Sequence, residues 1–344
     1  MKFGVFDHMD RAGTSIAKQY DDRLALVEAY EQAGFFGYYL AEHHSTPLGL
    51  APSPSVFLAA ASQRTSRIRL GALVFPLTMY HPLRIFEEIC MLDNLSGGRL
   101  DVGIGRGVSP VELGFYGVNP DDAQALYEEV TQIIRLGMTS KEISHEGKYF
   151  QIRDVPVEMS PMQDFPNGSM HRLPIWYGAA SPDTAERVAE RGYNLMCNGP
   201  AKGVRAITDR YRASWIKAGR SLDTLPLCGM SRHVVIAETS KEARDVAGEA
   251  YEHWYRHLIH LWRVKGIPFP LGFPSTVSDA IDAGFCLIGS PAEVRDLALK
   301  QVAEADVNFL LCRMAFGNLP REVSERTATF FQREIMPAFE SRVA

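Results

Sequence analysis

The sequence lacks an excess of basic residues. Its 344 residues include 36 Lys and Arg against 41 Asp and Glu, which gives a formal net charge of −5 at pH 7. A broad nucleic-acid-binding surface needs a basic excess to displace counterions from the phosphates. We therefore expect no nucleic acid among the partners of this protein.

Cysteine is scarce, and no two cysteines form a CxxC pair. Disulfide frameworks and structural zinc sites need cysteines at short, regular spacings, and the five here are widely scattered. The sequence therefore predicts neither kind of site. The five residues are Cys90, Cys197, Cys228, Cys286 and Cys312.

Long apolar runs are missing as well. No segment approaches the roughly 20 apolar residues of a membrane span. The first residues, MKFGVFDHMD, lack the apolar stretch of a signal peptide. The hydrophobic content of 46% is ordinary for a globular protein. We expect a soluble, cytoplasmic protein without membrane contact.

What the chain does contain is a repeated alternation of short β-like runs and longer helical patterns. In Tyr20–Gly34, for example, apolar residues recur three and four positions apart, as on one face of a helix. Repeated β/α units predict a parallel sheet covered by helices, and eight of them predict a closed (β/α)8 TIM barrel. The eight strand-like runs are KFGVF, YYLA, RIRLGALVF, LDVGIG, PIWYG, NLMCN, LCGMSRHVVIA and VNFLLCRM.

The chain is longer than a bare barrel, which takes about 250 residues. Residues 146–168 read as a strand pair with a Pro-containing loop, and residues 263–284 are rich in Pro and Gly. Long loops of this kind often act as lids or binding loops. No repeat or low-complexity stretch divides the chain. We therefore predict one barrel domain over residues 1–344 with these two insertions.

Three titratable residues follow the second predicted strand, in the stretch LAEHHSTPLGL. They are Glu42, His43 and His44, and the C-terminal ends of the strands carry the active site in TIM-barrel enzymes. A histidine with a free pKa of about 6.5 suits proton transfer near neutral pH. We take His43 as the main catalytic candidate, with Glu42 and His44 beside it. The alternative is a solvated turn without chemistry.

A metal site is a second alternative for the histidines. Adjacent residues of a strand point to opposite faces, so His43 and His44 make a poor chelate. The helical run HWYRHLIHLW places His253, His257 and His260 on one face, but its glutamate is not placed as in HExxH. We expect no metal, and we expect the helical histidines to line a pocket or an interface.

Two later segments are suited to an anion. GIGRGVSP does not match GxGxxG; it reads as a tight turn that offers Arg106 to an anion. GAASPDT leads into a helix whose first N–H groups are free, and Ser181 and Thr184 add hydroxyl groups. The second segment predicts a phosphate cradle. The alternative is an ordinary capped helix.

Together these segments resemble the bacterial luciferase-like family of flavin-dependent oxidoreductases. The motifs that carry the resemblance run in the family's order from about Lys2 to Phe339. The resemblance implies a (β/α)8 barrel that uses reduced FMN and often forms dimers, here a homodimer. The motifs are AEHH, HPLRIFEEICMLDNLSGGRLDVGIGRG, FYGVNPDDAQALYEEV, ASPDTAERVAERG, GSPAEV and LLCRMAFGNLP.

The resemblance also assigns roles around the flavin ring. In the luciferase branch the first histidine of the EHH motif works in proton transfer, and that residue is His43 here. A non-proline cis peptide bond often supports the isoalloxazine beneath the third strand. It would fall near Leu73–Val74.

The family's flavin phosphate is held by an arginine after the fourth strand and by a Ser and a Thr after the fifth. These correspond to Arg106, Ser181 and Thr184, with backbone contributions from Ala179 and Ala180. The resemblance therefore implies that these five residues bind the phosphate end of the cofactor.

One position departs from the family pattern. Luciferase has a second phosphate-binding arginine where this chain has Gln124. Glutamine donates hydrogen bonds but carries no charge. We expect weaker phosphate binding than with two arginines, in keeping with a flavin that exchanges with a separate reductase.

The resemblance implies a two-component monooxygenase. A separate flavin reductase would supply reduced FMN, and O2 would oxygenate a small organic substrate. We expect the loop 263–284 to close over the flavin, and expect Phe6, His8, Met79, Tyr80 and the helix near Trp254 to form walls. Three alternatives stay open: a deazaflavin-dependent dehydrogenase, a metal-dependent hydrolase and a non-catalytic flavin-binding relative.

Overall fold

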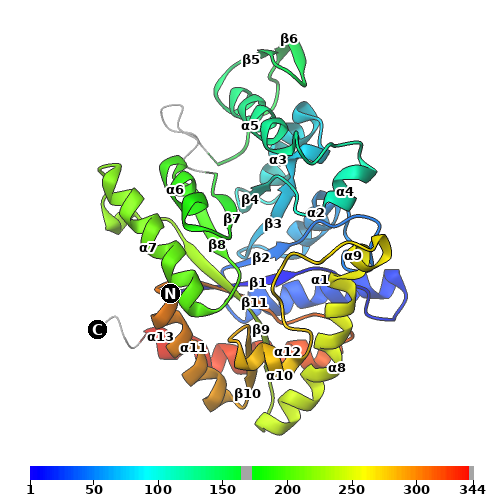
Figure 1. Ribbon diagram of the computed structural model, residues 1–344, viewed down its shortest axis with the longest axis vertical. Coiled ribbons are helices and arrows are strands. Elements are labelled where there is room, and N and C mark those ends of the chain that lie inside the picture. Colours follow the sequence, from blue (N-terminus) through cyan, green and yellow to red (C-terminus); the bar gives the residue numbers. More distant parts are fainter. Residues whose placement is uncertain (164–172, 341–344) are drawn as a thin grey trace.

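The structure is a computed structural model and describes residues 1–163 and 173–340. Eight parallel strands form a closed barrel, because β8 pairs with β9 as well as with β7. The predicted (β/α)8 barrel is therefore confirmed (Figure 1). In ring order the strands are β1 (Lys2–Asp7), β2 (Gly37–Leu40), β3 (Arg69–Pro76), β4 (Leu100–Gly105), β7 (Ile175–Ala179), β8 (Asn194–Cys197), β9 (Cys228–Ile236) and β11 (Phe309–Arg313).

The sheet has a ninth strand that the sequence analysis did not predict. Strand β10 (Cys286–Gly289) pairs in parallel with His233–Ile236, the second half of β9, and lies outside the ring. It was missed because CLIG is only four residues long and directly follows the segment read as a loop. The long β9 makes room for it, since its first half already pairs with β8 and β11.

Helices follow most of the strands, and several begin with a Ser-Pro pair. In α6 the Ser181 hydroxyl accepts a hydrogen bond from the amide of Thr184, as an N-cap does. The helices are α1 (Ile16–Gln32), α2 (Pro54–Arg64), α3 (Pro82–Leu95), α4 (Pro110–Phe115), α5 (Ala123–Thr139), α6 (Pro182–Arg191), α7 (Ala201–Lys217), α8 (Ser240–Leu258), α9 (His260–Lys265), α10 (Val277–Asp282), α11 (Pro291–Ala305), α12 (Arg321–Phe330) and α13 (Met336–Glu340).

Aromatic and apolar side chains fill the inside of the barrel. Successive side chains of a strand point to opposite faces, so residues two apart share the interior. The apolar interior cluster includes Phe6, Tyr39, Trp176, Met196, Phe309 and Leu311. Polar residues follow at the C-terminal ends of the same strands, two residues after Phe6, Met196 and Leu311 and four after Tyr39. They are His8, Asn198, Arg313 and His43, and all four line the cavity described below. The fold therefore collects polar side chains above an apolar plug.

The first insertion is an antiparallel hairpin. Its strands β5 (Glu142–Glu146) and β6 (Gln151–Pro156) stand beside α5, away from the barrel (Figure 1). The predicted strand pair is present, but its first strand begins before the expected boundary. Residues 164–168 of the predicted insertion lie outside the described residues.

The second insertion follows a broken helix. The run HWYRHLIHLW was read as one continuous helical stretch, and the structure has two helices there, α8 and α9, separated at Ile259. A loop over residues 266–276 then leads to α10, which lies inside the region read as a loop. Among the described residues, no helix combines the length and apolar character needed to cross a membrane.

Candidate active site

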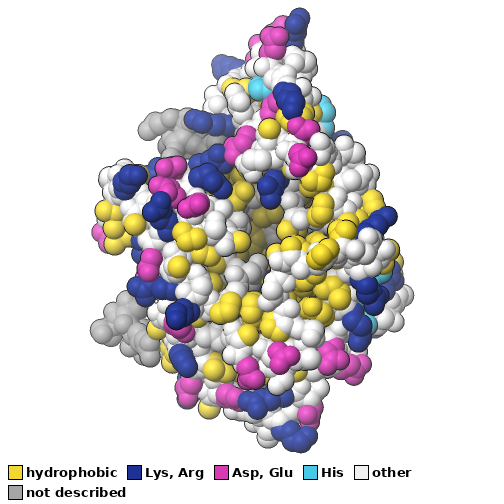
Figure 2. All heavy atoms as spheres, viewed as in Figure 1, with side chains coloured by type: hydrophobic (Ala, Val, Ile, Leu, Met, Phe, Trp, Pro, Cys, Tyr) yellow, Lys and Arg dark blue, Asp and Glu magenta, His cyan; other side chains and the backbone are white. Residues whose placement is uncertain are grey.

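A cavity of about 600 Å³ lies at the C-terminal ends of the barrel strands. The visible face in Figure 2 is hollowed near its middle, over the barrel, and hydrophobic side chains border the hollow. Eight predicted site residues line the cavity: Glu42, His43, Leu73, Val74, Arg106, Gln124, Ala180 and Thr184. His44, Ala179 and Ser181 are not among the lining residues, although each is adjacent in sequence to one that is.

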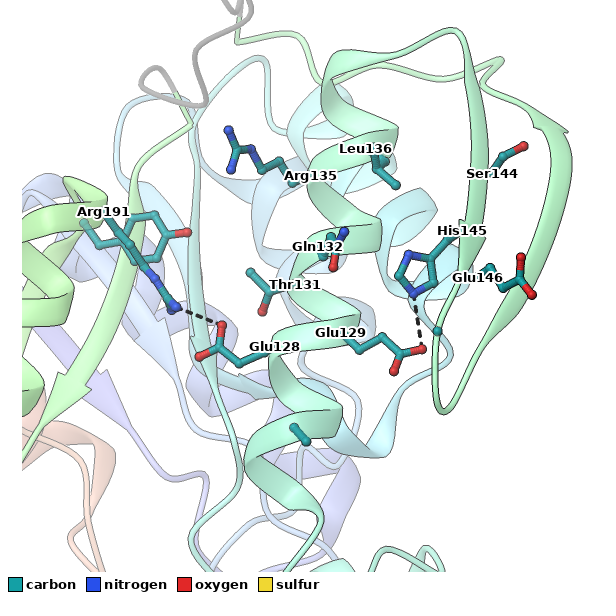
Figure 3. A pocket seen from close by; sticks show the side chains of 13 residues that line it. Glu128, Glu129, Thr131, Gln132, Arg135, Leu136, Ser144, His145, Glu146 and Arg191 are labelled. Carbon is teal, nitrogen blue, oxygen red and sulfur yellow. Dashed lines mark hydrogen bonds and ion pairs between the residues drawn. The ribbon is translucent and has the colours of Figure 1, made fainter.

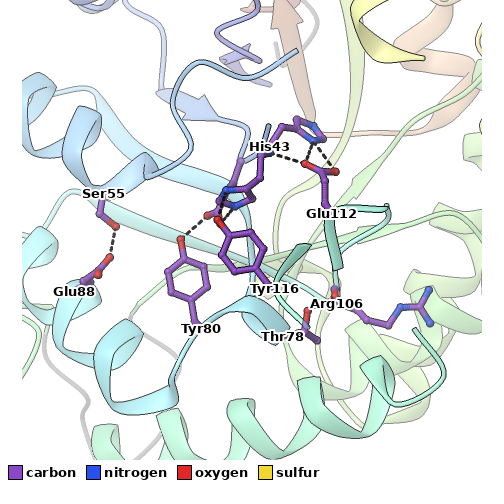
Figure 4. Close-up of polar contacts among 10 residues, drawn as sticks. His43, Ser55, Thr78, Tyr80, Glu88, Arg106, Glu112 and Tyr116 are labelled. Carbon is purple, nitrogen blue, oxygen red and sulfur yellow. Dashed lines mark hydrogen bonds and ion pairs between the residues drawn. The ribbon is translucent and has the colours of Figure 1, made fainter. Parts of the chain in front are cut away.

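His43 has a carboxylate partner from helix α4, which follows another barrel strand. Its Nδ1 lies 3.3 Å from Oε1 of Glu112, a residue of α4 (Figure 4). The same carboxylate accepts the backbone N–H of His44 at 2.6 Å. Burial by itself raises the pKa of Glu112, but the hydrogen bonds from His43 and His44 outweigh it and hold the pKa below its usual value. The carboxylate is therefore ionised at neutral pH and can only accept, which places a proton on Nδ1 of His43.

This pair gives a pH-dependent prediction for Glu112→Gln. A carboxylate whose pKa is depressed in the folded state adds stability above its unfolded pKa, and loses it as the pH falls through the folded value. We expect a lower midpoint of thermal unfolding for the variant at pH 7, since hydrogen bonds to a charged group are worth about 1.5–3 kcal/mol. The difference between the unfolding midpoints of the wild type and the variant should become smaller toward pH 3. Parallel midpoints of both proteins across this pH range would contradict the prediction.

Glu42 and His44 form a second chain of hydrogen bonds. His44 Nε2 lies 2.9 Å from Oε1 of Glu42, and Oε2 of Glu42 accepts the Tyr80 hydroxyl at 2.6 Å. The Tyr116 hydroxyl lies 2.7 Å from Nδ1 of His44. Burial raises the pKa of Glu42 despite the hydrogen bonds from His44 and Tyr80. Glu42 thus orients His44 rather than His43, and both ring nitrogens of His44 have partners.

The predicted phosphate residues gather at one end of the cavity. Thr184 and Arg106 line it, and Arg187 Nη2 donates to Thr184 Oγ1 at 3.3 Å. Tyr177 also lines it: burial raises the pKa of this phenol, and the nearby charges of Arg106 and Arg187 oppose the shift. Two arginines, a hydroxyl and the start of α6 therefore face one space, an arrangement that suits a phosphate.

The other predicted residues of this end are placed as follows. Ser181 caps α6, with its Oγ 3.1 Å from Thr184 Oγ1. The Gln124 amide lines the cavity and donates to Glu128 at 2.9 Å. Ala179 is buried at the end of β7, and Ala180 follows on the wall. The peptide bond between Leu73 and Val74 is cis and lies on the wall as well, at the position the resemblance implied.

Aromatic residues close the opposite side of the cavity. Trp254 of α8, Trp262 of α9 and Phe273 of the following loop line it, together with Phe6 of β1 and His8, which directly follows β1. The second insertion therefore contributes Phe273 to the wall, and its closing over a flavin stays a prediction. Tyr80, another expected wall residue, is instead a partner of Glu42 and does not line the cavity.

The histidines of α8 have partners in the β1–α1 segment. His253 Nε2 lies 3.0 Å from the carbonyl oxygen of Arg11, and His257 Nδ1 lies 3.5 Å from a carboxylate oxygen of Asp10. In residues 1–163 and 173–340 no group of three or more His, Cys, Asp or Glu is placed to hold a metal ion.

A second, more open cavity of about 920 Å³ lies between α5 and the hairpin β5–β6 (Figure 3). Four of its ionisable side chains are paired with one another. His145 Nε2 lies 3.2 Å from Glu129, whose carboxylate also accepts the backbone N–H of Phe150 at 2.8 Å. Arg191 donates to Glu128 at 2.8 Å. These contacts hold the hairpin against the helix, so the barrel cavity is the better candidate for chemistry.

Sequence reasoning missed Glu112, Arg187 and Arg313 of the site. Glu112 stands in the pattern Ser-x-x-Glu from Ser109, which predicts a helix start but not a carboxylate turned toward His43. Arg313 ends β11, so the strand-end argument applied to His43 would have found it. Arg187 lies one helical turn after Thr184.

Comparison with known proteins gives the family. The family model described as luciferase-like monooxygenase matches residues 1–307. An uncharacterized protein, y4wF, from Sinorhizobium fredii is 40% identical over 98% of this chain and 96% of its own length.

Solved structures share the fold over nearly the whole chain. The monooxygenase RslO1 from Streptomyces bottropensis has a TM-score of 0.87 at 27% identity and covers 98% of this chain and 100% of its own. The oxygenating constituent of 3,6-diketocamphane monooxygenase from Pseudomonas putida, in complex with FMN, has 0.81 at 21% identity and covers 98% of both chains. An F420-dependent tetrahydromethanopterin reductase from Methanopyrus kandleri has 0.72 at 21% identity, with 98% and 99% covered, and like the previous one shows the fold alone. The chain belongs to the luciferase-like monooxygenase family and is a flavin-dependent monooxygenase.

Proposed function

We propose that this chain is the oxygenase of a two-component system. It would take reduced FMN from a separate flavin reductase and use O2 to oxygenate a small organic substrate. The observation that carries the proposal is that one cavity joins a phosphate-binding end, at Arg106 and Thr184, to the His43–Glu112 pair. The fold neighbour solved with FMN bound is described as an oxygenating constituent, and we propose the same cofactor and the same need for a partner here.

The residues of the cavity fit FMN. A cation at Arg106, the hydroxyl of Thr184 and the capped start of α6 suit a dianionic phosphate. Gly178 lines the cavity, and no atom lies within 4 Å of where its Cβ would stand. The space beside Gly178 is therefore open to a ligand. The Leu73–Val74 peptide lies on the same wall, where it would bear on the ring system.

Reduced flavin, when bound, supplies the electrons that activate O2. The chain holds the phosphate through Arg106, Gln124 and Thr184, and Trp254 and Phe273 exclude water from the opposite side. His43 has its Nδ1 proton directed at ionised Glu112. Nε2 is then the ring atom that accepts or delivers a proton during turnover. Glu42 and His44 position this loop through Tyr80 and Tyr116.

Three further properties belong to the proposal. Residues 1–344 act as one domain, two copies form a homodimer, and the enzyme works in the cytoplasm. Gel filtration with light scattering tests the dimer, and limited proteolysis tests the single domain.

The proposal is tested by mixing the purified protein with photochemically reduced FMN and then with oxygenated buffer in a stopped-flow instrument. We expect reduced FMN to bind and its reoxidation to follow a different time course from that of free reduced FMN. Tighter binding of coenzyme F420 than of FMN would favour the deazaflavin-dependent alternative. Binding of FMN without any O2-dependent turnover in a substrate screen would indicate a non-catalytic relative.

The neutral residue at the phosphate end gives a second test. Gln124→Arg should tighten FMN binding by about 10-fold, because a charge-assisted hydrogen bond adds about 1.4 kcal/mol or more. FMN affinity is measured by flavin fluorescence titration, with Gln124→Lys as a control for charge without the planar guanidinium. Unchanged affinity in the arginine variant would show that this position does not reach the phosphate. Glu128, which accepts from Gln124 now, could capture the new arginine, so the double variant with Glu128→Gln is measured in parallel.

A further inference from the structure

The floor of the cavity carries a buried cation without an anionic partner. Arg313 ends β11, is 5% exposed and lines the cavity. Among the described residues no carboxylate lies within ion-pair distance of its guanidinium. Nη2 donates to the neutral amide oxygen of Asn198 at 3.1 Å, and Nε has no hydrogen-bond partner. A buried charge of this kind is costly unless something else in the site balances it.

The groups around Arg313 do not supply the missing negative charge. Its guanidinium carbon lies 5.1 Å from the centre of the Phe6 ring. Burial lowers the pKa of His8 and of His233 well below the usual value, and the charge of Arg313 lowers both further. Both rings are therefore neutral: they carry no positive charge that would attract an anion, and no negative charge that would balance Arg313. Burial likewise lowers the pKa of Arg313 to about 10, which still leaves it charged at neutral pH.

The position of Arg313 separates it from the phosphate end. Around the closed barrel, three strands separate β11 from β4 in either direction, so Arg313 and Arg106 belong to opposite sides of the barrel. The aromatic wall of Trp254, Trp262 and Phe273 borders the same cavity. A ligand placed there would meet apolar rings along its body and one cation at its end, a pattern that orients small organic molecules.

We infer that Arg313 binds an anionic oxygen of the organic substrate, a carboxylate or a phenolate, and that Asn198 holds the guanidinium toward the cavity. The inference rests on the proposed function for the identity of the site. Asn198 is suited to this positioning role because its amide oxygen accepts from both the Ser231 hydroxyl and Arg313. The substrate class is therefore an aromatic or alicyclic acid rather than a neutral hydrocarbon.

The experiment compares benzoate with its neutral analogue benzyl alcohol, by calorimetric titration of the FMN-loaded protein at fixed ionic strength. We expect benzoate to bind at least about 10-fold more tightly, the factor that 1.4 kcal/mol corresponds to. Arg313→Met should remove the preference, and Arg313→Lys should retain part of it. Asn198→Asp places a carboxylate beside Arg313 with almost no change of shape, so it should remove the preference as well.

Stability distinguishes a binding role from a structural one. If Arg313 serves a ligand, Arg313→Met and Asn198→Asp should have unchanged or higher midpoints of thermal unfolding, since the first removes the unbalanced buried charge and the second supplies its counter-charge. Lower midpoints in both, with the benzoate preference intact, would overturn the inference. So would the absence of benzoate binding to the wild type.

Two further outcomes locate the anion. Loss of the benzoate preference in Arg106→Met but not in Arg313→Met would place it at the Arg106 end and overturn the inference. Weaker binding of reduced FMN to Arg313→Met, with an unchanged benzoate preference, would place the cation against the flavin and overturn it too. Failure of FMN to bind would contradict the proposed function alone, because the benzoate titration is then repeated on the flavin-free protein and still tests Arg313.

Discussion

Replacing His43 with Ala is expected to lower the turnover number by about 10²- to 10⁴-fold while leaving FMN affinity within about twofold of the wild type. The reason is that His43 reaches the cavity with its Nδ1 engaged by ionised Glu112, which leaves Nε2 to exchange a proton. Turnover is measured as ¹⁸O transferred from ¹⁸O2 to a product of the wild-type enzyme, and FMN affinity by fluorescence. Full ¹⁸O transfer by the variant would show that His43 is not required for the oxygenation reaction.

Two matched variants make this test specific. Glu112→Gln keeps the shape of the side chain but can donate a hydrogen bond to Nδ1, which favours the wrong tautomer of His43. It should lose activity nearly as strongly as His43→Ala and should shift the pH profile of turnover. His44→Ala removes the neighbouring ring, whose nitrogens are already occupied by Glu42 and Tyr116. Its effect on turnover should be much smaller, so equal losses in all three variants would indicate a collapsed loop rather than a proton-transfer role.

The barrel could be predicted from the sequence because its signals are local. Each of the eight barrel strands is a largely apolar run with a helix after it, and this pattern can be read without knowledge of the strand's partners. Strand β10 could not be predicted, since four residues after a loop carry too little pattern and its pairing depends on the unused half of β9. The break between α8 and α9 was also invisible, because the apolar spacing continues across Ile259.

The position of the site could be predicted because, in a TIM barrel, it lies at the C-terminal ends of the strands. The segment just after β2 brings His43 to the cavity, and it brings Glu42 and His44, two residues apart, to a direct hydrogen bond with each other. The partner of His43 could not be predicted. Glu112 comes from α4, about 70 residues later, and only the fold brings it within reach. Long-range pairs of this kind need the tertiary structure.

The second large effect concerns the phosphate end: Arg106→Met should weaken FMN binding by about 10- to 100-fold and leave riboflavin binding unchanged. Arg106 follows β4 at the mouth of the cavity, its carbonyl oxygen held by the Thr78 hydroxyl at 2.8 Å, so the loop keeps its shape when the side chain changes. A hydrogen bond to a charged group is worth about 1.5–3 kcal/mol, which corresponds to this range. Riboflavin lacks the phosphate and is therefore the control ligand. Equal losses for FMN and riboflavin would mean that the substitution disturbs the ring end of the cavity. Loss of neither would assign the phosphate to Arg187 and Thr184 at the start of α6, the other cation and hydroxyl that face the same space.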